Sequence, residues 1–149
     1  MPVQVTAPLA GTAIGLALVP DPVFSTAMVG PGLAIDPDRR PSTVVAPVGG
    51  TLVKLKPHAL VVVAEGGRGV LVHLGIDTVK LDGEGFTLLA IEGDTVDAGQ
   101  PIVEWDPVAV EARGLSPVCP VVALDADSAA IGQLAAGPIE VGAPLFTWS

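Results

Sequence analysis

The side chains best suited to chemistry in this 149-residue chain are its two histidines, His58 and His73. An imidazole that is neutral near pH 7 is nucleophilic, so it can take up a phosphoryl group or bind a metal ion. A lone histidine on a strand is most often structural. The spacing of His58 and His73 is that of one β-hairpin, however, and neighbouring strands would turn two isolated histidines into a pair.

The sequence around His73 alternates as a half-buried strand does. In residues 70–77 successive side chains would point to opposite faces of a strand. One face carries four apolar side chains: Val70, Val72, Leu74 and Ile76. The other face carries Leu71, His73, Gly75 and Asp77. The imidazole is therefore expected on the open face, beside a glycine that leaves room for an approaching group.

His58 stands directly before a second apolar run, residues 59–64, which also reads as a strand. If the two runs are neighbouring strands, they bring the two imidazoles together. Zinc is the main chemical alternative, since His73 and Asp77 have an H-x-x-x-D spacing. A catalytic zinc ion needs three protein ligands and an open position, and the set His58, His73 and Asp77 would use both histidines. We therefore expect no bound metal and no other cofactor.

The composition indicates an all-β domain. Hydrophobic residues make up 50% of the chain, and 18 Gly and 15 Pro divide them into short bursts. Short runs rich in Val, Leu and Ile between frequent breakers are typical of strands joined by turns. A chain of 149 residues suits one hydrophobic core, so residues 1–149 are expected to form a single domain.

The formal net charge of −9 limits the possible partners. Nucleic acids bind clustered Lys and Arg and are excluded, whereas a partner with a basic patch suits this charge. The chain shows no signal peptide and no apolar stretch of membrane-spanning length, so we expect a soluble cytoplasmic protein. The single cysteine, Cys119, is expected to be a buried apolar side chain.

Two motifs occur twice in the chain. Residues 7–12 match residues 46–51, and positions between residues 96 and 105 match positions between residues 139 and 148. Two copies are too few for a solenoid. The repeat instead predicts a duplicated β motif in which neither half buries its apolar face alone. The expected fold is a β-sandwich or flattened barrel with one or two short helical turns.

The expected strands follow the apolar runs. Their ranges are 3–7, 12–18, 32–35, 43–47, 51–55, 59–64, 70–76, 78–81, 86–91, 101–104, 118–123 and 144–147. Short helical pieces are expected after Asp21 and after Asp106, because each aspartate is an N-cap residue followed by a proline.

Residues 93–102 resemble the hairpins of lipoyl- and biotin-carrier domains. Those domains need a lysine at an exposed hairpin tip, and Lys54, Lys56 and Lys80 are not expected at such a tip. The likeness is better explained by a shared β architecture than by a carrier function.

Nearly the whole chain resembles the glucose-type IIA component of the bacterial phosphoenolpyruvate-dependent sugar phosphotransferase system. The most specific block is residues 72–81 together with residues 83–86. The other markers are residues 19–24, 30–35, 45–48 and 58–59.

The resemblance implies a phosphocarrier, that is, a phosphotransferase component. His73 takes the place of the phosphorylated histidine, modified on Nε2, and His58 that of the second histidine, which hydrogen-bonds the phosphoryl group. The family receives phosphate from the histidine phosphocarrier protein and passes it to a cysteine on a sugar-specific IIB domain of a membrane permease. Asp21 and Asp77 match carboxylates beside the site. The surrounding apolar docking surface is matched by Val23, Phe24, Leu71 and Val79.

The chain departs from the family at one position beside the site. Members commonly carry a threonine two residues before the first histidine, whereas this chain has Lys56 there, followed by Pro57. A hydroxyl partner for His58 is therefore missing. Lys56 either supplies positive charge near the phosphate or is solvated, and the solvated interpretation is favoured.

The resemblance leaves one alternative function open. Members of the family also act as regulatory binding proteins, which use the same face to control transporters or enzymes according to their phosphorylation state. The transported sugar is not implied, because that choice lies with the membrane partner. The unit itself does not span a membrane, and we expect a separate soluble subunit.

Overall fold

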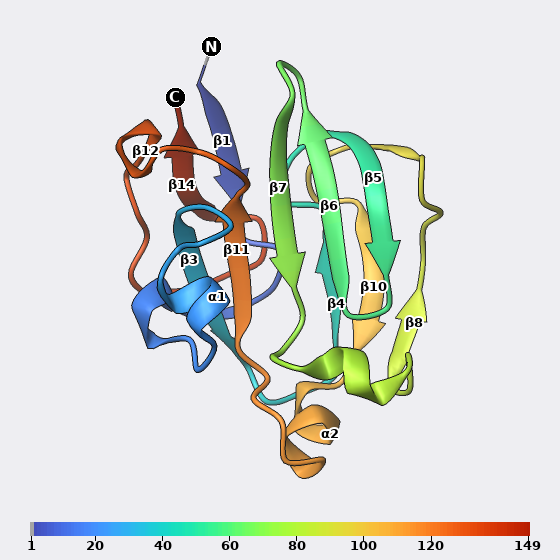
Figure 1. Ribbon diagram of the computed structural model, residues 1–149. Coiled ribbons are helices and arrows are strands. Elements are labelled where there is room, and N and C mark those ends of the chain that lie inside the picture. Colours follow the sequence, from blue (N-terminus) through green and yellow to red (C-terminus); the bar gives the residue numbers. More distant parts are fainter. Residues whose placement is uncertain (1) are drawn as a thin grey trace.

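Residues 2–149 form a β-sandwich in the computed structural model (Figure 1), which consists of three antiparallel sheets and short helical turns. The strands are β1 (Val3–Thr6), β2 (Gly11–Gly15), β3 (Gly32–Pro37), β4 (Ser42–Val45), β5 (Gly50–Lys56), β6 (Ala59–Ala64), β7 (Arg68–His73), β8 (Phe86–Leu88), β9 (Thr95–Val96), β10 (Pro101–Trp105), β11 (Cys119–Ala123), β12 (Ile131–Gly132), β13 (Gly137–Ile139) and β14 (Pro144–Trp148). The helices are α1 (Pro22–Ser25) and α2 (Pro107–Ala112), with 3₁₀ turns η1 (Leu16–Leu18), η2 (Thr78–Leu81) and η3 (Ser128–Ala130). The all-β expectation is confirmed.

The largest sheet has eight strands in the order β13-β2-β3-β11-β7-β6-β5-β9. Two three-stranded sheets, β1-β14-β12 and β4-β10-β8, complete the structure. The main core contains residues from all three sheets, among them Val5, Val72 and Ile102, each with no exposed surface. In Figure 1, α1 lies in front of β3 and α2 lies at the lower end of the molecule.

The repeated motifs occupy equivalent places in the fold. Gly11 in β2 pairs with Ile139, and Gly50 in β5 pairs with Val96, so each half contributes the same hairpin edge to the large sheet. The outer strands repeat in the same way, since β1 pairs with β14 and β4 pairs with β10. The expected duplication of a β motif is therefore visible in the pairing.

A reciprocal pair of backbone hydrogen bonds joins the two halves. The N–H of Thr6 donates to the carbonyl of Pro47 at 2.9 Å, and the N–H of Val45 donates to the carbonyl of Pro8 at the same distance. Each half thus satisfies backbone groups of the other, which buried strands require. Neither half is a complete structure alone.

The expected strand at residues 78–81 is wrong. That segment is the 3₁₀ turn η2, and β7 already ends at His73. Asp77 and Asp82 on either side of η2 adopt left-handed backbone angles, with φ of 60° and 50°, which an extended chain cannot contain. The expectations also omitted β9, β12 and β13, which are only two or three residues long.

Both expected helical pieces are present. Asp21 caps α1 by accepting from the N–H of Val23 at 2.8 Å, and Asp106 caps α2 by accepting from the N–H of Val108 at 3.0 Å. A proline occupies the first turn of each helix, where its missing N–H is tolerated. Both helices are short, and no helix within residues 2–149 has the length and apolar character of a membrane span.

A second, smaller core lies between α1, η1 and the outer face of the large sheet. Its buried members are Leu16, Val19, Phe24, Ala34, Ile76 and Val122. Burial of apolar side chains is worth about 1.5–3 kcal/mol for each large residue. This cluster therefore holds α1 against the large sheet near the end of β7.

We expect Gly11→Ala and Gly50→Ala each to destabilise the fold. A Cβ at Gly11 would overlap the carbonyl of Asp36, and one at Gly50 the carbonyl of Val63. Such overpacking costs about 1–3 kcal/mol. Urea unfolding measures the loss, with Gly15→Ala as the control because a Cβ at Gly15 meets no atom within 4 Å. Losses no larger than that of the control would contradict this packing.

Candidate functional site

The register of β6 and β7 brings the two histidines together. Ala59 in β6 lies opposite His73 in β7, and the N–H of Leu74 donates to the carbonyl of His58 at 2.7 Å. The two imidazole rings have centroids 5.2 Å apart and meet edge to face at 71°. The expected pairing of the two imidazoles is confirmed.

A rigid two-residue turn carries His58. Pro57 and His58 connect Lys56 and Ala59, which are paired at the end of the β5–β6 hairpin. The proline ring fixes its own φ near −65°. Pro57 also packs against the loop after η2, since a Cβ at Gly83 would lie 3.2 Å from the Cγ of Pro57. Together these restraints limit the freedom of the imidazole beside them.

One hydrogen bond sets the orientation and the tautomer of His73. Its Nδ1 lies 2.5 Å from the carbonyl oxygen of Gly75. A carbonyl oxygen can only accept, so Nδ1 carries the proton of the neutral ring. The lone pair of the ring then lies on Nε2, the nitrogen that is free to act as a nucleophile.

Gly75 is buried, which corrects the expectation that it lies on the open face beside His73. The strand ends at His73, and Gly75 turns the chain with φ of +80°. A Cβ there would lie 2.7 Å from the side chain of Thr78 and 3.0 Å from the carbonyl of Ser116. Gly75 therefore orients the imidazole through its carbonyl and does not clear space for a partner.

Sequence reasoning missed Thr78, which holds this turn in place. Its side chain is only 1% exposed, and its hydroxyl donates to the carbonyl of Leu74 at 2.7 Å. The N–H of Ile76 donates to the carbonyl of Ser116 at 2.9 Å. The sequence pattern gave no signal for this role, because nothing in it marks the left-handed turn at Asp77 that precedes the threonine.

The predicted docking residues differ in exposure. Val79 is 60% exposed and Val23 is 40% exposed, while Leu71 is half-buried. Phe24 is buried, with its ring centroid 5.3 Å from that of His73. Phe24 is therefore a wall of the site and not part of an open surface.

Burial keeps both imidazoles neutral. Desolvation is the largest effect on His73 and lowers its pKa, although the hydrogen bond to Gly75 and the charges of Asp21 and Asp77 act in the opposite direction. The pKa of His58 is lowered first by desolvation and then by the charges of His73 and Lys56. At pH 7 the site therefore presents an uncharged nucleophile and an uncharged neighbour.

Other candidate chemistry finds no matching geometry. Within residues 2–149, no group of three or more His, Cys, Asp or Glu side chains is placed to hold a metal ion, so His58, His73 and Asp77 do not form a zinc site. Cys119 is fully buried, and desolvation raises its pKa to about 12, which leaves it an inert thiol. The arrangement is suited to a nucleophilic imidazole assisted by a second one.

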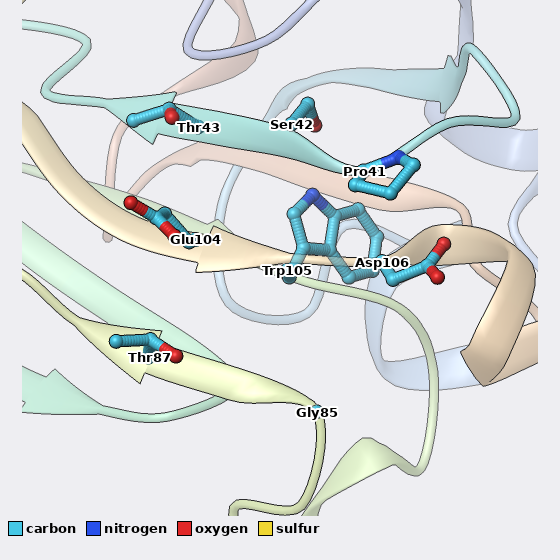
Figure 2. Close-up of a pocket in the computed structure, with 8 residues that line it drawn as sticks. All are labelled: Pro41, Ser42, Thr43, Gly85, Thr87, Glu104, Trp105 and Asp106. Carbon is cyan, nitrogen blue, oxygen red and sulfur yellow. The ribbon is translucent and has the colours of Figure 1, made fainter.

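A separate hollow of about 450 Å³ lies on the sheet β4-β10-β8 (Figure 2). Thr43, Glu104 and Thr87 lie side by side along it because they are paired across the three strands. Its lining contains no histidine, lysine or arginine. We therefore assign it no part in the chemistry of the two imidazoles.

Comparison with known proteins gives one consistent family. The family described as phosphoenolpyruvate-dependent sugar phosphotransferase system, EIIA 1, matches residues 3–129. The glucose-specific EIIA component of Halalkalibacterium halodurans is 43% identical over 127 residues, which cover 84% of this chain and 72% of that protein. The glucose-specific EIIBCA component of Corynebacterium glutamicum is 41% identical over 127 residues, but the match covers only 18% of that longer protein.

The fold has a close counterpart among solved structures. Glucose permease IIA from Mycoplasma capricolum superposes with a TM-score of 0.92 and 32% sequence identity. The superposition covers 99% of this chain and 96% of that one. A likeness of this extent shows that the two chains share one fold.

We expect both imidazoles to titrate below their ordinary pKa of 6.5, because their burial disfavours the charged forms. Between the lowered values and 6.5 the unfolded chain binds more protons than the folded one. The stability that the two neutral imidazoles contribute is therefore fully present above pH 6.5, and it is lost as the pH falls through their folded-state pKa values. NMR titration of the ring protons measures the first effect, and urea unfolding from neutral pH to about pH 5 measures the second.

The matched variants are His58→Gln and His73→Gln, which should each reduce the loss of stability in acid. A His73 resonance that titrates above 6.5, or an imidazole protonated on Nε2 at neutral pH, would contradict the geometry of this site.

Proposed function

Because this chain belongs to the phosphoenolpyruvate-dependent sugar phosphotransferase system EIIA 1 family, we propose that it carries the phosphoryl group on Nε2 of His73. The chain is a phosphoryl-transfer component of glucose-type sugar transport. The observation that supports His73 as the carrier is its hydrogen bond from Nδ1 to Gly75, which leaves Nε2 as the nucleophile.

The transfer needs positioning more than acid–base chemistry. The lone pair of Nε2 forms a bond to phosphorus as the bond between phosphorus and the donor nitrogen breaks, and the electron pair of that bond returns to the donor. The proton on Nδ1 stays hydrogen-bonded to Gly75, so no proton has to move. Phosphoryl transfer depends mainly on such in-line alignment and on charge stabilisation.

His58 is the candidate for charge stabilisation. Its ring lies edge to face with that of His73, and both rings are neutral at pH 7 because their pKa values are lowered. A neutral imidazole can donate its N–H to a phosphoryl oxygen. Phe24 and Leu71 limit the access of water to the same region, which protects a phosphoramidate from hydrolysis.

The partners follow from the family and from the charge of the surface. We infer that the donor is the histidine phosphocarrier protein, that the acceptor is the cysteine of a sugar-specific IIB domain, and that the exchange takes place in the cytoplasm. The name of the Corynebacterium glutamicum relative places IIB, IIC and IIA parts in one chain, which supports a IIB acceptor. Val23 and Val79 are the exposed apolar residues proposed to contact both partners.

We expect the two histidines to have separable roles. His73→Gln should neither accept nor pass on phosphate, because it lacks the nucleophile. His58→Gln should still accept phosphate from the upstream carrier, but its transfer to the IIB cysteine should slow by about 10²–10³, as when one charge-stabilising donor is lost. A two-step relay with purified carriers, timed separately for each step, measures both effects.

Two outcomes would contradict this division. Phosphate mapped to His58, Ser or Cys119 by mass spectrometry would exclude His73 as the carrier. Transfer from His58→Gln to IIB at the wild-type rate would make His58 only a structural neighbour. The mapped phosphate should also be lost in acid and retained in base, as a phosphohistidine is.

We expect electrostatic steering to assist docking of a basic donor. The net charge is −9, and Asp21 and Asp77 both influence the charge of His73. Association rates should fall with added salt, because at an ionic strength of about 0.15 M screening limits the range over which exposed charges interact to about 8 Å. The double variant Asp21→Asn with Asp77→Asn should flatten this dependence in stopped-flow binding. An unchanged slope would show that other charges govern the encounter.

A further inference from the structure

Lys56 projects from the same face of the large sheet as His73. Lys56 in β5 is paired with Ala59 in β6, and Ala59 is paired with His73 in β7. Directly paired residues on antiparallel strands project to the same side. Adjacent strands are about 4.8 Å apart, so only the small methyl group of Ala59 stands between the lysine stem and the imidazole.

Lys56 is also tied to the turn that carries His58. It is the last residue of β5 and precedes Pro57, whose fixed φ limits the motion of the turn. The positive charge of Lys56 contributes to the lowered pKa of His58, which shows that the ammonium and this imidazole are within electrostatic reach. The stem of four carbons is flexible enough to bring the ammonium toward either ring.

No carboxylate of the described residues 2–149 is paired with Lys56. The ion pairs there belong to arginines: Arg39 with Asp36 and Glu111, Arg40 with Asp38, and Arg113 with Glu84. Glu92, which lies beside β5, accepts instead from the N–H of Leu55 at 2.9 Å. The ammonium of Lys56 is exposed and available to a new anion.

The resting site lacks a cation of its own. Two neutral imidazoles and the carboxylates of Asp21 and Asp77 surround the position where phosphate would be held. A phosphoryl group adds up to two negative charges there. The ring of His73, protonated on Nδ1 and bonded to phosphorus at Nε2, offsets one of these charges. The remaining negative charge meets only a neutral donor and two carboxylates, which disfavour the phosphorylated state.

We propose that the ammonium of Lys56 binds the phosphoryl oxygens on Nε2 of His73 and stabilises the phosphorylated protein. This inference rests on the proposed function of His73. The bonds made and broken are those of the transfer itself, because the lysine remains protonated and contributes only hydrogen bonds and charge. Members of the family commonly have a threonine at this position. Its hydroxyl could supply one hydrogen bond to the site, whereas Lys56 supplies positive charge as well.

The test compares Lys56→Gln and Lys56→Met with Lys56→Arg and with the matched control Lys54→Gln. Lys54 projects from the same face of β5, but it lies in the next row, paired with Val61 instead of Ala59. The readouts are the equilibrium partition of phosphate between the purified upstream carrier and this protein, and the pH titration of the phosphohistidine by ³¹P NMR.

The neutral variants should shift the partition toward the upstream carrier by about three- to tenfold at low salt, the size of effect that two unit charges about 4 Å apart have in bulk water. They should also raise the pKa of the phosphoryl group, a change that a purely structural role would not produce. Lys56→Arg should restore both values, and Lys54→Gln should resemble the wild type.

Each contrary outcome has a separate meaning. If wild-type protein carries phosphate on His73 but the neutral variants keep its partition and titration, Lys56 does not bind the phosphoryl group. Equal shifts in Lys54→Gln and Lys56→Gln would also overturn the proposal, because they would show a general effect of net charge. If the wild type takes no phosphate on His73, the proposed function fails first.

Discussion

The register of β6 against β7 is the constraint on which the site depends. It places Ala59 opposite His73 and lets the N–H of Leu74 reach the carbonyl of His58. A slip of one residue would move every side chain of β7 to the opposite face, which would bury the imidazole of His73 and expose Val72. The buried alternation of β7 and the rigid Pro57–His58 turn both oppose such a slip.

The electrostatics of the site follow from this placement. Phe24 of α1 lies beside the ring of His73. Desolvation lowers the pKa values of both imidazoles, and for His73 it does so despite the charges of Asp21 and Asp77. A neutral nucleophile costs little to maintain, whereas the phosphorylated state adds charge that must be offset. The same surface can therefore attract a basic donor through its carboxylates while Lys56 at the end of β5, two strands from β7, stabilises the transferred group.

The sequence predicted the parts of the structure that depend on local pattern. The alternation in residues 70–73 and the hairpin-length spacing of the histidines predicted that His58 and His73 lie together, as they do. The repeated motif predicted the duplicated β motif seen in the strand pairing. The roles of Gly75 and residues 78–81 were misjudged, because β7 ends at His73 and the left-handed angles at Gly75, Asp77 and Asp82 turn the chain without any change in hydrophobicity. The burial of Phe24 depends on tertiary packing of α1, which no local pattern contains.

The most direct test is the position of phosphorus on the imidazole. Protein labelled with ¹⁵N in its histidine rings can be phosphorylated by the upstream carriers and examined for coupling between ³¹P and ¹⁵N. We predict coupling to Nε2 of His73, with the proton retained on Nδ1 and hydrogen-bonded to Gly75. Coupling to Nδ1 of His73, or to either nitrogen of His58, would contradict the assignment.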